Sequence, residues 1–191
     1  MNKTALVTGA TSGIGRATAR ILAKNNYKII LCGRREDRLT ALEKELSEYT
    51  EIHTLSFDVR DKKAVFESIN SLPEAFSTID ILINNAGIIK RIPLIEMEVA
   101  DFQEVIDIDL VSPFIVSKHV AKGMIARQQG KIINICSMMS ELGRDTVSAY
   151  AAAKGAENSL TLALAQALSP EVRVNAICPA FIDSSWWDKF Y

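Results

Sequence analysis

Residues 8–15 read Thr-Gly-Ala-Thr-Ser-Gly-Ile-Gly, between a short apolar run at the amino terminus and a helical pattern that continues to Lys24. Glycine allows a tight strand-to-helix turn, and it lets backbone N–H groups and the positive end of the helix approach an anion closely. In the first crossover unit of an α/β chain such a turn predicts a site for a dinucleotide pyrophosphate, although glycines also close turns that bind nothing. The candidate binding residues are Gly9, Thr11, Ser12, Gly13, Ile14 and Gly15.

Short apolar runs alternate with helical patterns along the whole chain, which is typical of a parallel sheet with crossover helices on both faces. The expected strands span residues 4–7, 28–32, 52–57, 79–83, 131–135 and 172–177. Several are apolar at consecutive positions, as strands buried on both faces should be. We therefore predict one α/β domain over residues 1–191, a Rossmann-type doubly wound parallel sheet with strand order 3-2-1-4-5-6.

Two longer helices are expected within residues 99–127 and 147–168, and both are apolar around much of their circumference. That pattern favours burial against something besides the sheet, and subunit packing is the obvious candidate. Pro113 lies inside the first of these helices and should bend it.

The 191 residues carry 22 basic and 23 acidic side chains, a formal charge of −1, and 48% of them are hydrophobic. This balance excludes a disordered chain and argues against a nucleic-acid binder with a broad basic face. No stretch approaches the roughly 18 to 20 apolar residues that cross a bilayer, and we expect no secretory leader.

Cys32, Cys136 and Cys178 are odd in number and far apart, and each stands near the end of an apolar run. They predict buried, reduced thiols and a cytoplasmic protein. The two histidines, His53 and His119, lie in a predicted strand and a predicted helix, and no Cys-x-x-Cys or paired-histidine spacing occurs. We expect no metal site and no serine–histidine triad.

The second expected strand ends in Cys-Gly-Arg34-Arg35, where a dinucleotide-binding fold meets the adenosine ribose. An NAD site usually places an acidic residue there, whereas arginine suits the 2′-phosphate of NADP by charge and geometry. The pair favours NADP, with NAD the less favoured cofactor. The alternative is that both arginines are solvated and pair with Glu36 or Asp37.

Tyr150 and Lys154 are four residues apart at the start of a predicted helix, so both side chains share one face. A nearby cation favours the phenolate and lowers the pKa of tyrosine, as proton exchange near neutral pH requires. Ser137 ends the fifth expected strand at the sheet edge where such folds bind ligands. Each of these signals is weak alone, because such pairs and serines also arise by chance.

Four motifs together resemble the short-chain dehydrogenase/reductase family: residues 8–15, Asn84-Asn85-Ala86-Gly87, Ser137, and Tyr150-x-x-x-Lys154. The resemblance implies that Tyr150 is the general acid or base, that Lys154 lowers its pKa and holds the nicotinamide ribose, and that Ser137 orients the substrate. It also implies a homo-oligomer, because relatives usually form dimers or tetramers. The further cofactor contacts it implies are Asp58, Val59, Asn85, Ala86, Gly87 and Pro179.

The chain departs from the family pattern at three places. Asp109 stands where the family has a proton-relaying asparagine, and it remains a candidate catalytic residue, against the alternative of a carboxylate that pairs with a neighbouring cation. Ala180 and Ser184 stand where glycine and threonine are usual. Relatives also continue past the equivalent of Tyr191, so we expect the last family strand to be missing and water to be poorly excluded.

Residues up to about Gly87 are most like NADP-dependent serine or allo-threonine dehydrogenases, whereas residues 88–93, 105–110 and 136–144 are most like gluconate 5-dehydrogenases. The second match surrounds the predicted active site. Arg91, and more weakly Arg144, are candidates to grip a substrate carboxylate, although a solvent-facing arginine is the ordinary alternative. Trp186 and Trp187 could line a substrate wall, but core or subunit packing is the favoured interpretation.

The sequence thus predicts an NADP-dependent oxidoreductase that acts on a secondary alcohol or ketone of a small molecule, a sugar acid such as gluconate or 5-ketogluconate. Two alternatives stay open. One is a short 3-hydroxy acid substrate, and the other is a truncated dinucleotide-binding module without turnover.

Overall fold

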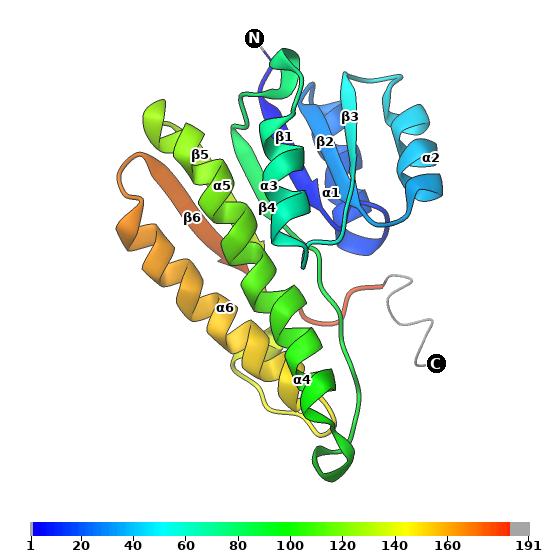
Figure 1. The fold of residues 1–191 in the computed structure, drawn as a ribbon, viewed down its shortest axis with the longest axis vertical. Coiled ribbons are helices and arrows are strands. Elements are labelled where there is room, and N and C mark those ends of the chain that lie inside the picture. The colour runs from blue at the N-terminus through cyan, green and yellow to red at the C-terminus, as the bar shows by residue number, and fades with distance from the viewer. Residues whose placement is uncertain (1, 184–191) are drawn as a thin grey trace.

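The computed structural model describes residues 2–183 and contains a six-stranded parallel sheet of order β3-β2-β1-β4-β5-β6 (Figure 1). The strands are β1 (Thr4–Thr8), β2 (Lys28–Gly33), β3 (Ile52–Ser56), β4 (Ile81–Asn84), β5 (Gly130–Ile135) and β6 (Val172–Ile177). The predicted fold class and strand order are confirmed, and the strand ends differ from expectation by at most two residues.

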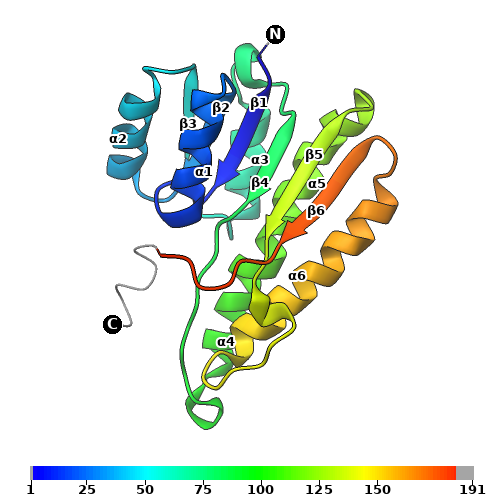
Figure 2. The ribbon, with the colours of Figure 1, turned by 180° about the vertical axis from the view of Figure 1, so that it is seen from behind.

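Helices cover the sheet on two faces, as Figures 1 and 2 show from opposite sides. The helices α1 (Gly13–Lys24) and α2 (Glu36–Leu46) bury their apolar side chains against one face of β1, β2 and β4. On the other face lie α3 (Lys62–Asn70), α5 (Ser112–Ala126) and α6 (Ser148–Ala167). Alternate residues of each strand therefore enter different cores, which explains their consecutive apolar positions.

The expected helix over residues 99–127 is divided. It consists of α4 (Val99–Ile106), a π-helical segment η3 (Asp107–Val111) and then α5. The bend predicted from Pro113 is accommodated here, because proline stands in the first turn of α5, where its missing N–H costs little. The π-helical segment carries Asp109, which is fully buried, and such segments recur at functional sites.

Three short 3-10 helices complete the described elements: η1 (Glu74–Phe76), η2 (Leu94–Glu96) and η4 (Met138–Ser140). Over residues 2–183, no helix is both long enough and apolar enough to span a membrane. The subunit packing expected for the long helices stays a prediction.

A buried polar network joins the centre of the sheet to the helices of one face. The Asn84 amide donates to Ser117 Oγ at 2.9 Å and to Asn134 Oδ1 at 2.8 Å, so it links β4 to α5 and β5. Asn134 donates in turn to Thr161 Oγ1 at 2.8 Å, on α6. These bonds position α5 and α6 relative to the strand ends from which the site is built.

Candidate active site

A pocket of about 570 Å³ lies at the carboxyl ends of the six strands, and its size suits a small molecule or cofactor. The predicted residues that line it are Gly9, Thr11, Ser12, Gly13, Ile14, Arg34, Arg35, Asp58, Val59, Asn85, Ala86, Gly87, Asp109, Ser137, Tyr150, Lys154 and Pro179. Gly15 and Arg91 do not line it. Residues far apart in the sequence are thus brought to a single cavity.

The glycine turn is held by the segment that follows β4. Gly9 and Gly13 have φ angles of +63° and +50°, which glycine adopts without strain. The Asn85 side chain donates to the carbonyl oxygens of Thr8 and Gly9 at 3.0 and 3.2 Å, so it braces the turn as well as lining the pocket. A Cβ at Gly15 would lie 2.5 Å from Gly9 O and meet the Asn85 amide, so glycine is required there although it lies behind the pocket.

The first turn of α1 can receive an anion. Its N-cap residue, Ser12, makes no side-chain hydrogen bond to the backbone N–H groups of the turn, and those groups have no partner within the helix. Ser12, Gly13 and Ile14 of this turn line the pocket. The positive end of the helix dipole adds to the attraction, so the turn fits a pyrophosphate group.

Arginine side chains gather where β2 ends. Arg34 pairs with Asp58 at 3.5 Å, and Arg35 donates to Thr11 Oγ1 at 2.9 Å. The carboxylate of Asp58 is also bound by Arg60 at 2.7 Å, and this hydrogen-bonded guanidinium lowers the pKa of Asp58. Sequence reasoning missed Arg38, which lines the pocket one helical turn beyond Arg34.

Ser137 and Tyr150 meet on the opposite side of the pocket. Ser137 is buried at the end of β5, where its hydroxyl caps η4 by accepting from Met139 N at 3.2 Å. Burial raises the pKa of Tyr150, while the neighbouring Lys154 and Ser137 lower it, and the pKa remains above its ordinary value. The expected lowering by Lys154 is therefore present but outweighed, because burial disfavours the phenolate and two carboxyl groups oppose the lysine.

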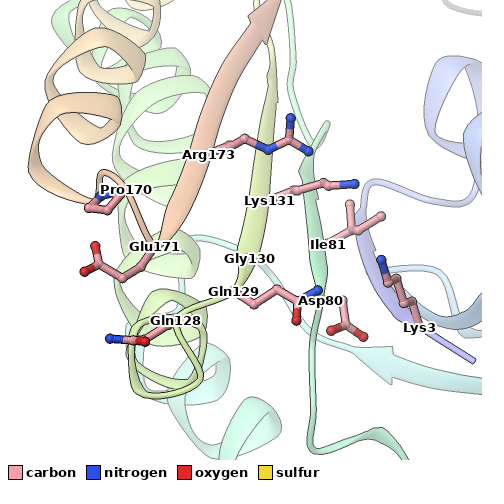
Figure 3. A pocket seen from close by; sticks show the side chains of 10 residues that line it. All are labelled: Lys3, Asp80, Ile81, Gln128, Gln129, Gly130, Lys131, Pro170, Glu171 and Arg173. Carbon is pink, nitrogen blue, oxygen red and sulfur yellow. The ribbon is translucent and has the colours of Figure 1, made fainter. Parts of the chain in front are cut away.

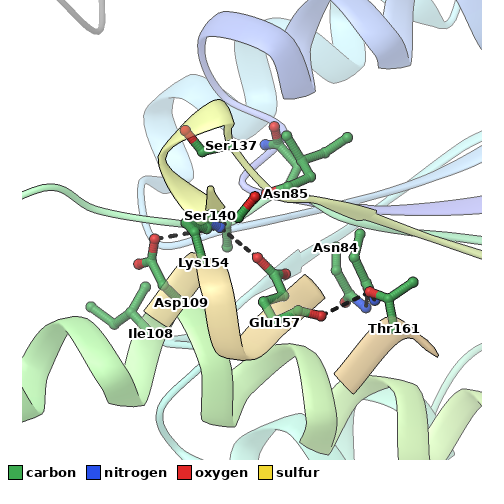
Figure 4. Close-up of polar contacts among 12 residues, drawn as sticks. Asn84, Asn85, Ile108, Asp109, Ser137, Ser140, Lys154, Glu157 and Thr161 are labelled. Atoms are coloured by element: carbon green, nitrogen blue, oxygen red, sulfur yellow. Dashed lines mark hydrogen bonds and ion pairs between the residues drawn. The ribbon is translucent and has the colours of Figure 1, made fainter. Parts of the chain in front are cut away.

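Figure 4 shows those carboxyl groups around Lys154. Lys154 Nζ donates to Glu157 Oε2 at 2.8 Å and to Ile135 O at 2.9 Å, and it lies 3.5 Å from Asp109 Oδ2. Burial lowers the pKa of Lys154, but the two carboxyl groups raise it more. Burial is also the largest influence on the carboxyl groups, and it raises the pKa of both.

Glu157 is the main functional candidate that sequence reasoning missed. Its signal was its place three residues after Lys154, which puts both side chains on one face of α6. From the sequence, a glutamate in this helix is expected at the surface. Only the packing of α6 shows that Glu157 is buried.

The arginines proposed for the substrate lie outside the pocket lining. Arg91 is half-buried and follows Ile88 and Ile89, which line the pocket. The Arg144 guanidinium lies 5.2 Å from the ring centre of Phe181, a cation–π contact. Neither arginine is among the residues that line the pocket. Ser184, Trp186 and Trp187 lie outside the described residues.

A second hollow of about 300 Å³ lies at the opposite edge of the sheet, at the amino ends of the strands (Figure 3). Its charged lining consists of Lys3, Asp80, Lys131, Glu171 and Arg173. None of them was predicted from the sequence as a site residue. Within the described part of the chain, no three His, Cys, Asp or Glu side chains are placed to hold a metal ion.

The cysteines differ in accessibility. Cys32 and Cys136 are buried as expected, but Cys178 is exposed, so the prediction of three buried thiols was wrong at this position. Cys178 follows the end of β6, which among the strands of residues 2–183 has a neighbour on one side only. Burial raises the pKa of Cys32, and it raises that of Cys136 to about 12.

The comparisons with known proteins agree on one family. A family model described as short chain dehydrogenase matches residues 3–190. The 2-dehydro-3-deoxy-D-gluconate 5-dehydrogenase of Formosa agariphila is 49% identical over 186 residues, 96% of this chain and 70% of that protein. The gluconate 5-dehydrogenase of Gluconobacter oxydans is 37% identical over 97% of this chain and 73% of its own length. A crystal structure of a gluconate 5-dehydrogenase from Burkholderia cenocepacia, in complex with NADP and tartrate, matches with a TM-score of 0.92 and 35% identity, covering 99% of this chain and 75% of that one.

Alkylation tests the environments of the three thiols. At pH 8 we expect iodoacetamide to modify Cys178 in the folded protein and to spare Cys32 and Cys136, since a thiol with a pKa of about 12 is ionised in only about one molecule in 10⁴. Peptide mass spectrometry reads the sites. Unfolding in guanidinium chloride is the control and should expose all three thiols. Modification of folded Cys136 as fast as Cys178 would contradict the packing described.

Proposed function

The chain belongs to the short-chain dehydrogenase family, and on that premise we propose that it is an oxidoreductase that transfers a hydride between NADP(H) and a secondary alcohol or ketone of a sugar acid. The observation that carries the proposal is the shared pocket. An anion-binding helix turn, an arginine-rich ribose end, and the Ser137, Tyr150 and Lys154 side chains all open on one cavity.

The residues around the pocket fit a nicotinamide dinucleotide. The α1 turn would take the pyrophosphate, and Arg34, Arg35 and Arg38 would surround a 2′-phosphate, where their charge and planar donors favour NADP over NAD. When bound, the nicotinamide supplies or accepts the hydride. Val59 and Phe57 would offer apolar surface to the adenine, and Gly87 leaves room for the chain to pass close to the cofactor.

The chemical step requires a proton as well as a hydride. Tyr150 would give its phenolic proton to the carbonyl oxygen during reduction, and its phenolate would accept a proton during oxidation. Ser137, which lines the same pocket as Tyr150, would hold the same oxygen by donating its hydroxyl hydrogen. Lys154 keeps a positive charge beside this pair, with its ammonium 5.9 Å from the centre of the Tyr150 ring.

The substrate class follows from relatives that share most of the chain. Two of them are named for dehydrogenation at C5 of gluconate or of its 2-dehydro-3-deoxy derivative. A third was crystallised with tartrate, a hydroxy acid, alongside NADP. We extend this to a sugar acid here, with Arg91 as the candidate partner for its carboxylate, because it follows the pocket-lining Ile88 and Ile89 closely in the chain. A short 3-hydroxy acid is the alternative substrate, and cofactor binding without turnover is the alternative function.

Turnover tests the proposal directly. We expect NADPH absorbance to fall with 5-ketogluconate or with the 5-keto form of 2-dehydro-3-deoxygluconate, and Tyr150→Phe to lower kcat by about 10² to 10⁴ because the proton donor is gone. Tyr49→Phe, at an exposed tyrosine, is the matched control.

The other outcomes separate the alternatives. NADP reduction with serine or allo-threonine, and none with gluconate-type acids, would favour the 3-hydroxy acid. Enhanced NADPH fluorescence on binding with no turnover of any of these compounds would favour the binding module.

Cofactor choice is expected to depend on Arg34. Arg34→Asp should weaken NADPH binding about tenfold or more and spare NADH, since it replaces a charge-assisted partner of the 2′-phosphate with a repulsive one. Fluorescence titration of both cofactors measures the ratio. Arg173→Asp, with the same charge change at the opposite edge of the sheet, is the control. An unchanged ratio of the two dissociation constants refutes the assignment.

The carboxylate partner is tested by substrate kinetics. Arg91→Ala should raise the KM for 5-ketogluconate about tenfold while kcat is largely kept, because a uniform binding contact is lost. Arg144→Ala serves as the comparison, since its guanidinium contacts Phe181. If KM is the same in Arg91→Ala as in the unmodified protein, another residue holds the carboxylate.

A further inference from the structure

Three ionisable groups are buried together at the wall of the pocket: Lys154, Asp109 and Glu157, which we call the lysine cluster. Lys154 is 4% exposed, and both carboxyl residues are 0% exposed. Asp109 comes from the π-helical segment η3, whereas Lys154 and Glu157 come from α6 (Figure 4). With every group ionised, one cation would face two anions, and the cluster would hold a net charge of −1 away from water.

Such a charge is unfavourable in a protein interior. An uncompensated buried ion costs several kcal/mol, and a group avoids that cost by changing its protonation state. The hydrogen bonds support the same conclusion. One oxygen of each carboxyl group is buried with no hydrogen-bond partner among the described residues: Asp109 Oδ2 and Glu157 Oε1. An ionised carboxylate would need donors at these atoms.

The two carboxyl groups bind the lysine unequally. Glu157 Oε2 accepts a hydrogen bond from Lys154 Nζ at 2.8 Å, whereas Asp109 Oδ2 is 3.5 Å away. The other oxygen of Asp109 accepts from Ile88 N at 2.8 Å. The short contact therefore makes Glu157 the closer counter-ion of Lys154.

We propose that Glu157 is a positioning residue of this active site and the counter-ion of Lys154. Glu157 and Asp109 together carry one proton, which we call the shared proton, so only one of the two is ionised and the lysine cluster is neutral. The proposal rests on the proposed function, because it concerns the lysine beside Tyr150. It adds a residue that acts through Lys154, and it explains how a carboxyl group at position 109 is accommodated beside another one.

The shared proton affects the charge that Tyr150 experiences. Lys154 favours the phenolate, and each ionised carboxylate opposes it. A neutral cluster leaves one counter-charge against the lysine, whereas two ionised carboxylates would leave an excess negative charge beside the phenol. Glu157 and Asp109 together thus set the pH range in which Tyr150 exchanges its proton.

Other titratable groups face the cluster from the surrounding elements. Tyr150 faces it from the first turn of α6, and Cys136 approaches Glu157 and Lys154 from the end of β5. Cys178, at the end of β6, faces Cys136. The thiol of Cys136 stays protonated near neutral pH, with a pKa of about 12, so it adds no negative charge to the cluster.

Infrared spectroscopy tests the shared proton without using the reaction. At pH 7 the exposed carboxyl groups are ionised, so a buried protonated one gives a separate carbonyl band. We expect this band in the unmodified protein and its loss in both Asp109→Asn and Glu157→Gln, because the remaining carboxyl group ionises as the partner of Lys154. Glu67→Gln, at an exposed glutamate, should keep the band. A spectrum of the unmodified protein without the band overturns the proposal.

The pH dependence of alcohol oxidation tests the effect on Tyr150. Each single variant keeps one carboxylate, so the pH at which the rate rises should stay within about 0.3 unit, whatever happens to the maximal rate. Asp109→Asn with Glu157→Gln should move it about one unit or more toward lower pH, because the Tyr150–Lys154 pair then loses a proton from an uncompensated positive site. Asp109→Asn with Glu157→Asp, which retains one carboxylate, should restore it.

The contrary results are distinct. A shift to lower pH in each single variant would mean that both carboxyl groups are ionised in the unmodified protein, which refutes sharing. A double variant with an unmoved profile would mean that Glu157 acts on stability alone. If the double variant does not fold, as judged by circular dichroism, the infrared spectra of the single variants still decide. If no substrate is turned over, the proposed function fails while the infrared result stands.

Discussion

The parallel direction of the six strands is the constraint on which the site depends. Because every strand runs the same way, all carboxyl ends reach one edge of the sheet, and the segments that follow the six strands meet there. The glycine turn, the arginine pair, Asn85 and Ser137 occupy these loops. Parallel neighbours require crossover connections, which helices provide here, so the fold and the gathering of the site have one cause.

Burial then determines how the gathered groups behave. Tyr150, Lys154, Asp109 and Glu157 all have pKa values above their ordinary range, but for different reasons. Burial raises the values of the three acids because it disfavours their anions, whereas for Lys154 the neighbouring carboxyl groups outweigh burial. The lysine expected to act on the tyrosine alone is shared with two carboxyl groups, which weakens its influence and links the protonation of all four.

Local patterns predicted much of this correctly and failed where packing decided. The strands followed from apolar runs, and the glycine turn, the arginine pair and the Ser-Tyr-Lys set followed from local motifs. Other predicted pocket residues, such as Asp58 and Asn85, came from the resemblance to the family, and Arg38 was not predicted. Pro113 predicted a bend but not the π-helical turn that carries Asp109, since the turn depends on how α4 and α5 pack. Cys178 looked buried because it ends an apolar run, yet β6 is an edge strand in the described chain. Glu157 was missed because its spacing from Lys154 is a weak signal on its own, and only the packing of α6 shows that the glutamate is buried.

The sequence by itself determined the fold class, the strand order and the main motifs of the pocket, because apolar periodicity and the special conformations of glycine and proline are local properties of the chain. The tertiary structure decided which charged side chains lie close together in the buried interior. Asp109 and Lys154 are 45 positions apart in the sequence, and only the packing of the π-helical segment against α6 places them 3.5 Å from each other. Electrostatic energies depend on the distance between charges and on their burial, and neither quantity follows directly from the residue order.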